Sequence, residues 1–511
     1  MPCFIPRAAR AALPLVLFAQ AAAADVTPAE VWADWRVYME GMGYVVDGTE
    51  TANGADLTVS DLRFGSLAPE GGGAMAVSLG TLTFKQDADG SVAVVMPEVM
   101  PITVDITPAD AESKPLQFDI DLTQTAPLMT VSGDAQQMTY AYSAETAGLI
   151  LTQLQVGGET FGAENAGFNL LATGLAARTV AKVGEKRVQE QIASIENLQY
   201  ELLVNNPMDA TAMRLKGAGS DIGITGGSTM PLTAEADGLG DMIAAGFTGR
   251  GRLTFGGGGT ELTLSDPVNG DVNIVTASDG GNLDVSLAPE GLGYAGQQTG
   301  ISVDLNLPGM TFPIQFAMEE GAFDLDVPVL TSAEAQPFSA LIDLDGFTMS
   351  DAIWNIFDPA QDLPRTSASV LLDLAGRVRL LADLFDPATA ERMADPETQP
   401  AEIHALTLNA LSVKALDAEL TGEGSVEFDN EDLAAYQGMP KPVGQVTLAL
   451  AGANALIDQL VASGLLPQQQ AMGARMVLGL FAKPGDDPDT LTSEIRFTPA
   501  GEILANGQRI R

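Results

Sequence analysis

The chain has 511 residues, with 67 Asp or Glu against 25 Lys or Arg and a formal net charge of −42 at pH 7. That negative charge opposes binding to nucleic acid phosphates and to anionic membrane surfaces. A single cysteine (Cys3) and a single histidine (His404) exclude a disulfide framework, a cysteine-ligated metal centre and a histidine-rich zinc site.

The N-terminus has the pattern of a secretory signal peptide. Arg7 and Arg10 precede a short apolar run at residues 11–19, and small residues at 22–24 offer a cleavage site. The run is too short for a membrane span, which needs roughly 18–20 apolar residues. We therefore predict a signal peptide at residues 1–24; an uncleaved N-terminal anchor is the alternative.

Cleavage would leave residues 25–511 as a mature protein in the periplasm. Loss of Arg7 and Arg10 takes the 25 basic residues to 23 against 67 acidic ones, so the net charge becomes −44. Loss of Cys3 leaves no thiol. A chain of this length can bury a sizeable core, and we expect it to be stabilised by burial alone.

The first mature element is predicted to be a helix. Thr27 is a suitable N-cap, Pro28 fits the first helical position, and Gly41 and Gly43 favour its end. Its apolar residues repeat at helical spacing: Val31, Trp32, Trp35, Tyr38 and Met39. The acidic residues Glu30, Asp34 and Glu40 oppose membrane docking, so we expect this helix to pack on the body of the protein.

After Gly43 the apolar pattern changes to strict alternation, which predicts half-buried strands. Alternating segments occupy residues 102–106, 116–122, 283–287 and 301–307. Residues 312–318 and 323–327 alternate on either side of 319–322, a spacing that predicts a hairpin. Turn-forming clusters at 86–90 and 278–282 separate strands. Many one-sided strands joined by short turns predict antiparallel sheet.

The C-terminal part combines strands with short helices. Residues 351–364 predict a short helix closed by prolines, and strands resume around 406–408, 426–428 and 446–450. Two helices follow, one at 454–463 and one that opens at Pro467 and carries Met472, Met476 and Leu480. A final hairpin pairs 490–497 with 502–506. Residues 182–198 fit either a helix or a strand.

Catalytic and ligand-binding patterns are largely missing. His404 would have to serve any serine triad, yet no Gly-x-Ser-x-Gly elbow stands in the chain, so we interpret it as structural. Segments 85–90 and 341–346 lack the first acid of a calcium loop. The glycines at 256–259 lack the Lys-Ser/Thr of a phosphate loop. Loose calcium binding at the surface and a two-carboxylate hydrolase site stay open, because 67 acids cannot be placed from sequence.

Several C-terminal segments resemble a family of exported Gram-negative bacterial proteins catalogued only as a domain of unknown function. With the helix at Trp32, these segments are Trp354–Pro359, Leu363–Arg365, Phe428–Asn430, Gly438–Pro440, Gly464–Pro467, Ala471–Met476 and Ala505–Arg509. The resemblance extends over most of the mature chain and is weakest at 182–198. It implies a cell-envelope location and one continuous architecture, and it supplies no catalytic residues.

We therefore predict a mainly β (α+β) fold: extended antiparallel sheets with an N-terminal helix and a C-terminal helix pair. Residues 25–511 form one continuous body; the glycines at 256–259 mark either a join between two halves near 250–260 or a turn. The favoured function is a non-enzymatic periplasmic protein of binding or structural role, without catalytic, cofactor-binding or metal residues. The alternatives are a carrier of a lipid or other apolar ligand on a β-sheet groove and a carboxylate-based carbohydrate hydrolase. The partner is an unknown envelope protein or an apolar ligand, with no nucleic acid and no membrane span after cleavage.

Overall fold

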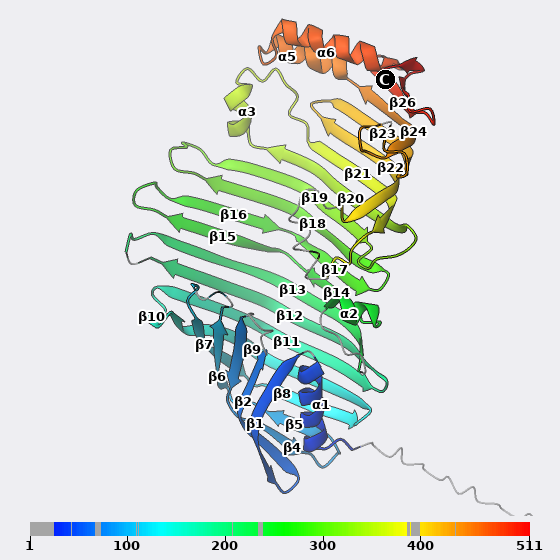
Figure 1. The fold of residues 1–511 in the computed structure, drawn as a ribbon. Coiled ribbons are helices and arrows are strands. Elements are labelled where there is room, and N and C mark those ends of the chain that lie inside the picture. The colour runs from blue at the N-terminus through cyan, green and yellow to red at the C-terminus, as the bar shows by residue number, and fades with distance from the viewer. Residues whose placement is uncertain are drawn as a thin grey trace, which may run out of the picture.

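The computed structural model describes residues 25–41, 43–66, 73–108, 110, 112–206, 208–232, 239–385, 389, 399–434 and 436–511. Within these ranges the strands form one 28-stranded sheet in which all pairings are antiparallel. Figure 1 shows that strands adjacent in sequence lie largely side by side from one end of the molecule to the other. The predicted fold class is confirmed, with a single sheet in place of several. The predicted signal peptide lies outside the described residues.

The N-terminal part consists of one helix and eight strands. Its elements are α1 (Pro28–Gly41), β1 (Tyr44–Asn53), β2 (Asp56–Ser66), β3 (Ala74–Leu79), β4 (Leu82–Gln86), β5 (Val92–Val95), β6 (Val99–Thr107), β7 (Leu116–Thr125) and β8 (Leu128–Asp134). The predicted first helix is confirmed. Thr27 caps it, because the Glu30 backbone N–H donates to Thr27 Oγ1 at 3.3 Å while the Glu30 carboxylate accepts from the Thr27 backbone N–H at 2.9 Å.

The middle of the sheet contains the longest strands. Its elements are β9 (Gln137–Val156), β10 (Glu159–Phe161), β11 (Ala166–Val183), β12 (Lys186–Asn205), β13 (Ala212–Pro231), α2 (Leu239–Ala244), β14 (Thr248–Phe255), β15 (Gly258–Ser265), β16 (Val272–Ser278), β17 (Gly280–Ala288), β18 (Gly291–Asn306), β19 (Ile314–Val327) and β20 (Gln336–Met349). The ambiguous segment 182–198 is strand, in β11 and β12. Gly256 and Gly257 lie between β14 and β15.

The C-terminal part carries the helix pair. Its elements are α3 (Asp351–Phe357), β21 (Ala368–Leu380), β22 (Ala401–Ala415), β23 (Ala418–Asp429), β24 (Lys441–Ala451), α5 (Ala453–Ala462), α6 (Gln468–Phe481), β25 (Lys483–Pro484), β26 (Thr490–Phe497), β27 (Ile503–Ala505) and β28 (Gln508–Arg509). The predicted short helix, the two later helices and the last hairpin are confirmed.

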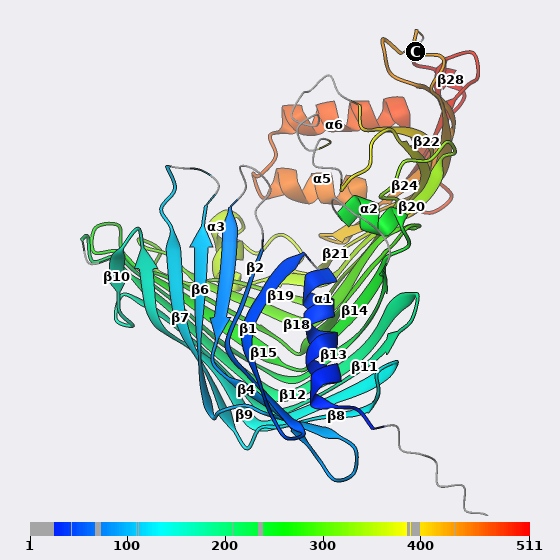
Figure 2. The ribbon, with the colours of Figure 1, turned by 60° about the horizontal axis from the view of Figure 1, so that its bottom comes forward.

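One row of residues interrupts the pairing of the long strands. The unpaired residues are Glu145, Gly174, Glu196, Asp221, Gly300, Glu319 and Gly346 within strands and Asp279 between β16 and β17. Along this row the register shifts only where β20 pairs with β21 across Gly346. The φ angles of Gly174, Gly300 and Gly346 lie between 59° and 69°, a region that favours glycine. A side chain at any of these three glycines would also collide with the acidic side chain of the neighbouring strand. Figure 2 shows the long strands bent, so that the sheet forms a trough.

The same row explains why one sequence prediction is wrong. Residues 314–327 form the single strand β19, not a hairpin. The unpaired Glu319 adds one residue, so the apolar positions change from even numbers before it to odd numbers after it. Both sets still lie on one face: Met318 Cε, Ile301 Cδ1 and Leu344 Cδ2 all surround Gly321. In the sequence, the change from even-numbered to odd-numbered apolar positions looks the same as the break that a hairpin turn would produce.

The main core lies at the N-terminal end of the trough. Helix α1 buries Val31 and Trp32 against strands β2, β4, β5, β8, β9 and β11. Phe84 and Val131 have no exposed surface, and the Trp35 ring meets the edge of Phe84 at 5.4 Å between centroids. Figure 2 shows α1 within the curve of the sheet. The expectation that this helix packs on the body of the protein is confirmed.

Candidate functional site

The sheet has an apolar face on the side of α1, here called the inner face. Residues paired across neighbouring strands point to the same side. One such row crosses seven strands: Phe168, Leu202, Leu215, Leu262, Ile274, Leu305 and Ile314. On the other side of the bend, Val285, Tyr294, Leu325 and Ala340 form a second row. The inner face is therefore a continuous apolar surface across the middle of the sheet.

The inner face continues into the C-terminal strands. The side chains of Leu408, Leu411 and Leu448 gather around Gly422, so strands β22, β23 and β24 present apolar groups to the same side. Among the helices that the structure describes, none covers the middle of this face. Val285 keeps 39% of its surface exposed, Tyr294 keeps 41% and Ile342 keeps 45%. Large side chains in a sheet core are normally buried, so an open row of them marks a binding surface.

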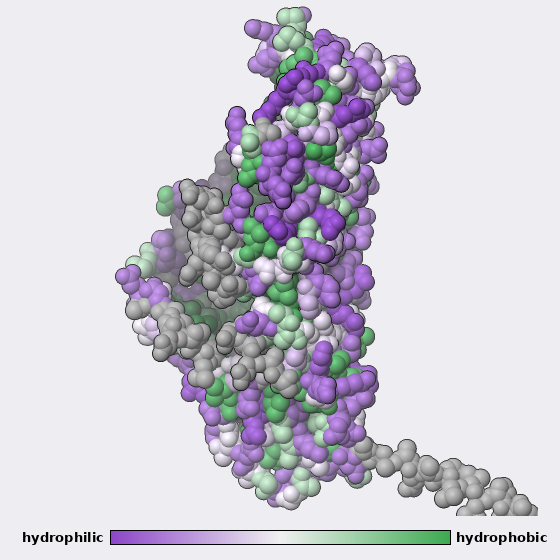
Figure 3. Space-filling model, turned by 45° about the vertical axis from the view of Figure 1, so that its right-hand side comes forward, coloured by the Kyte–Doolittle hydropathy of each residue, from purple (hydrophilic) through white to green (hydrophobic). Residues whose placement is uncertain are grey.

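The opposite, outer face carries charged side chains in cross-strand ion pairs. Its pairs include Arg214–Glu201, Lys216–Glu261, Arg250–Glu190 and Arg252–Asp284. Figure 3 shows hydrophilic residues over much of the visible surface. The two faces therefore differ in chemistry along the same strands: the outer one suits water, and the inner one suits an apolar ligand.

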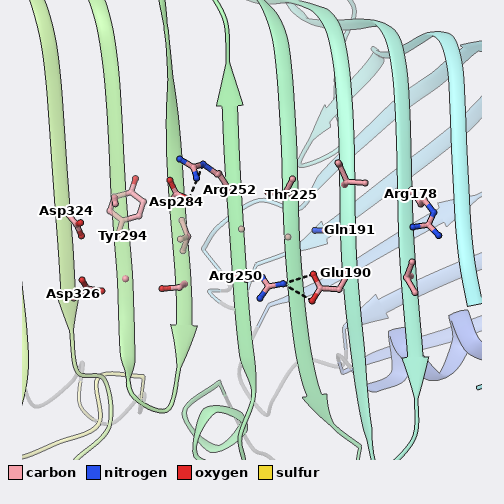
Figure 4. Close-up of a pocket in the computed structure, with 18 residues that line it drawn as sticks. Arg178, Glu190, Gln191, Thr225, Arg250, Arg252, Asp284, Tyr294, Asp324 and Asp326 are labelled. Carbon is pink, nitrogen blue, oxygen red and sulfur yellow. Dashed lines mark hydrogen bonds and ion pairs between the residues drawn. The ribbon is translucent and has the colours of Figure 1, made fainter. Parts of the chain in front are cut away.

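The outer face has a hollow of about 700 Å³, shown in Figure 4. Arg178, Arg250 and Arg252 line it together with carboxylates of β17 and β19. Burial raises the pKa of Asp324, and the nearby charges of Asp326 and Asp284 raise it further. This hollow is where the structure brings acids together, as the hydrolase alternative requires.

The hollow is a poor hydrolase site for two reasons. Arg252 lies 3.5 Å from Asp284 and offsets its charge. Asp324 and Asp326 project from one strand on an open sheet face, whereas a glycosidase holds its acids on opposite sides of a scissile bond.

His404 lies on β22. Its Nε2 atom lies 3.7 Å from Glu402 Oε2 and makes no hydrogen bond to any residue that the structure describes. Glu402 accepts a hydrogen bond from Arg379 Nε at 3.0 Å. A triad needs a hydroxyl nucleophile bonded to the histidine, and none of the described residues supplies one to His404.

Asp89 and Asp345, which were considered as calcium ligands, accept hydrogen bonds from backbone N–H groups and serine hydroxyls. Asp89 accepts from the Ser91 backbone N–H and hydroxyl, which lower its pKa. Asp345 accepts from Ser369 Oγ at 2.6 Å. Among the described residues, no group of three or more His, Cys, Asp or Glu side chains is placed to hold a metal ion. None of the described helices is long and apolar enough to cross a membrane.

An apolar cavity that is partly open to solvent lies at the α1 end of the inner face. It has a volume of about 240 Å³ and is lined by Trp32, Trp35, Tyr38, Met39, Val46, Leu62, Phe64, Leu79 and Leu82, with Arg36 as the charged exception. The cavity lies between α1 and strands β1, β2, β3 and β4. Its lining lies within residues 32–82 but comes from one helix and four strands, so only the two tryptophans of α1 pointed to it in the sequence.

A buried polar network fixes α1 over this cavity. Arg187 of β12 donates to both oxygens of Asp34, at 2.5 and 2.9 Å, and the Tyr140 hydroxyl of β9 donates to Asp34 at 2.5 Å. The Arg187 guanidinium also lies 4.7 Å from the ring centre of Tyr38. Burial, with the adjacent Asp34, raises the pKa of Tyr140 well above its usual value. We call these four residues the Asp34 network; in the sequence, Asp34 suggested only a solvated charge.

Comparison with known families finds a match that covers the second half of the chain. Residues 241–499 match the family described as an uncharacterized protein conserved in bacteria (DUF2125), and because this match covers just over half of the 511 residues, the chain belongs to that family. No curated protein matches the chain. The predicted resemblance to an uncharacterized bacterial family is confirmed. The helix at Trp32 and the segment Ala505–Arg509 lie outside the matched range.

Proposed function

We propose that this member of the family is a non-enzymatic periplasmic protein that holds a lipid, or another ligand with a long apolar chain, along the inner face. The observation that carries the proposal is the open apolar surface that crosses the sheet. Val285, Tyr294 and Leu325 are neighbours in one cross-strand row of this surface and are 39%, 41% and 36% exposed. The charged outer face keeps such a protein soluble.

The dimensions suit an extended chain. Strands lie about 4.8 Å apart, so the row from Phe168 to Ile314 crosses roughly 29 Å. A fully buried methylene contributes about 0.8 kcal/mol, so ten methylenes half-covered by the open face contribute about 4 kcal/mol. The apolar lining of the cavity beneath α1 suits the end of such a chain.

Two other functions are less well supported. A scaffold would dock an envelope protein on the same apolar face. Protein interfaces normally surround their apolar core with a polar rim, whereas the rows of the inner face are apolar along their length. A carbohydrate hydrolase would use the acids of the outer hollow, whose arrangement is unsuitable as described above. A scaffold and a hydrolase both differ from a lipid carrier in one measurable way: neither should retain bound lipid after purification.

The test uses two valines with the same exposure on opposite faces. Val285 lies on the inner face, paired with Tyr294, and is 39% exposed; Val275 lies on the outer face, paired with Glu261 and Asp304, and is 40% exposed. The full chain would be purified from the periplasm as wild type, V285E and V275E, and extracted lipid would be quantified by mass spectrometry. We expect bound lipid in the wild type and V275E, and a loss of about tenfold in V285E.

Equal lipid in the two variants, or no apolar ligand in the wild type, would contradict the proposal. The location has its own test. N-terminal sequencing of protein from a periplasmic fraction should begin at Asp25, and an intact Met1 on cytosolic material would contradict export.

A further inference from the structure

Helix α6 presents apolar side chains to solvent. Met472, Met476 and Leu480 are spaced four residues apart, so they lie on one side of the helix, and they are 64%, 73% and 61% exposed. Val477 and Phe481 widen the same stripe. An amphipathic helix normally turns such a stripe toward its own core, whereas here the buried residue of α6 is the small Ala471.

The helix is held in this position by contacts at its middle and at its C-terminal end. Arg475 pairs with Asp458 of α5 at 2.6 Å. At the C-terminal end, the carbonyl oxygen of Phe481 accepts from Ser493 Oγ at 2.6 Å and from Asn506 Nδ2 at 2.8 Å. Figures 1 and 2 show α6 beyond α5 at the C-terminal end of the sheet. The apolar stripe is therefore presented outward by a fixed helix.

The charge of this segment differs from that of the rest of the chain. No Asp or Glu stands between Asp458 and Asp486, although the chain has 67 of them. The charged residues in the interval are Arg475 and Lys483, both basic. The general repulsion between this acidic protein and anionic headgroups is therefore relieved where the apolar stripe is exposed.

We propose that α6 docks on the surface of a lipid bilayer, with Met472, Met476 and Leu480 among the acyl chains and Lys483 near the headgroup phosphates. An apolar side on a segment that carries no carboxylate of its own is a feature of an interfacial helix. A protein partner would instead favour hydrogen-bonding and oppositely charged groups around the stripe. The inference rests on the proposed function, because the bilayer is the source or destination of the ligand, and α6 lies at the end of the same sheet.

The test is flotation with vesicles of phosphatidylethanolamine and phosphatidylglycerol. The wild type would be compared with M472Q/M476Q/L480Q and with a control, L171Q/I192Q/V275Q, which removes three exposed apolar side chains from the outer face. We expect the wild type and the control to float, and the α6 variant to bind at least about tenfold more weakly. Extracted lipid should be unchanged in the α6 variant, which separates a failure of docking from a failure of ligand binding.

A second measurement keeps the proposal testable if the triple variant does not fold. In protein purified from the periplasm, which without residues 1–24 has no other cysteine, an environment-sensitive dye would be attached to M476C or, as control, to V275C. Vesicles should shift the emission of the dye at position 476 to the blue and leave position 275 unchanged. Equal shifts at both positions, no flotation of the wild type, or an α6 variant that only changes from dimer to monomer would overturn the inference.

Discussion

Removal of the Asp34 carboxylate should release α1 from the sheet. The side chains of Asp34 and Arg187 are 8% and 4% exposed, so D34A leaves a buried guanidinium without its partner. Breaking a buried pair in this way costs about 3–5 kcal/mol. The Tyr140 hydroxyl loses its acceptor in the same step, and because the groups form one network, the two costs are not additive.

The matched control is a surface pair. Glu201 and Arg214 approach to 2.7 Å, but their side chains are 42% and 54% exposed. E201A should therefore cost at most about 1 kcal/mol. The contrast between the two variants comes from burial, since both remove one carboxylate from one arginine.

Hydrogen exchange of the α1 amides measures this difference locally, which suits a chain too long for two-state unfolding. A loss of about 3 kcal/mol corresponds to exchange about 100-fold faster. We expect that acceleration in D34A and almost none in E201A. The double variant D34L/R187M, which removes both charges, should recover much of the protection. Equal hydrogen exchange of the α1 amides in D34A and the wild type would refute the claim that the Asp34 network holds α1 on the sheet.

Three further predictions concern other parts of the fold. G300V should destabilise the bend, because the residue needs a φ of 59° and its side chain would meet the Asp279 carboxylate; the thermal unfolding midpoint should fall, whereas S302V, two residues along the same strand, should leave it nearly unchanged. Burial raises the pKa of Tyr140 in the folded protein, so above pH 10 the unfolded chain loses the Tyr140 proton while the folded protein keeps it. The free energy of unfolding should therefore fall with rising pH. In urea titrations, Y140F should make this fall shallower. Asp489 accepts from the first backbone N–H groups of α5, mainly that of Ala455, which lowers its pKa; D489A should weaken α5 by about 1 kcal/mol by hydrogen exchange, and the wild-type contribution should disappear as the pH falls through that lowered pKa.

The local elements were predictable because each has a local cause. Thr27 and Pro28 start α1, Pro467 precedes α6, and strict alternation in segments such as 116–122 requires a one-sided strand. These signals depend on residues within a few positions of one another. Antiparallel pairing follows from short turns between such strands.

The form of the sheet was not predictable from those local signals. The row of unpaired residues is aligned by the register of many strands. In the sequence, Glu319 was therefore interpreted as part of a hairpin turn, and Gly346 only as the end of a segment that fails as a calcium loop. The inner face likewise depends on which side chains pair across strands. Asp34 is the clearest case: its partner Arg187 lies 153 residues away, so the sequence showed a charged helix face where the structure has a buried ion pair.

Photo-crosslinking in cells tests the central claim most directly. A benzophenone amino acid would replace Leu305 or Leu325 on the inner face, and Ile192 or Val275 on the outer face. The adducts would be identified by mass spectrometry of the purified protein. The account predicts adducts with acyl chains at both inner positions and none at the outer positions; protein adducts at the inner positions, or lipid adducts equally on both faces, would contradict it.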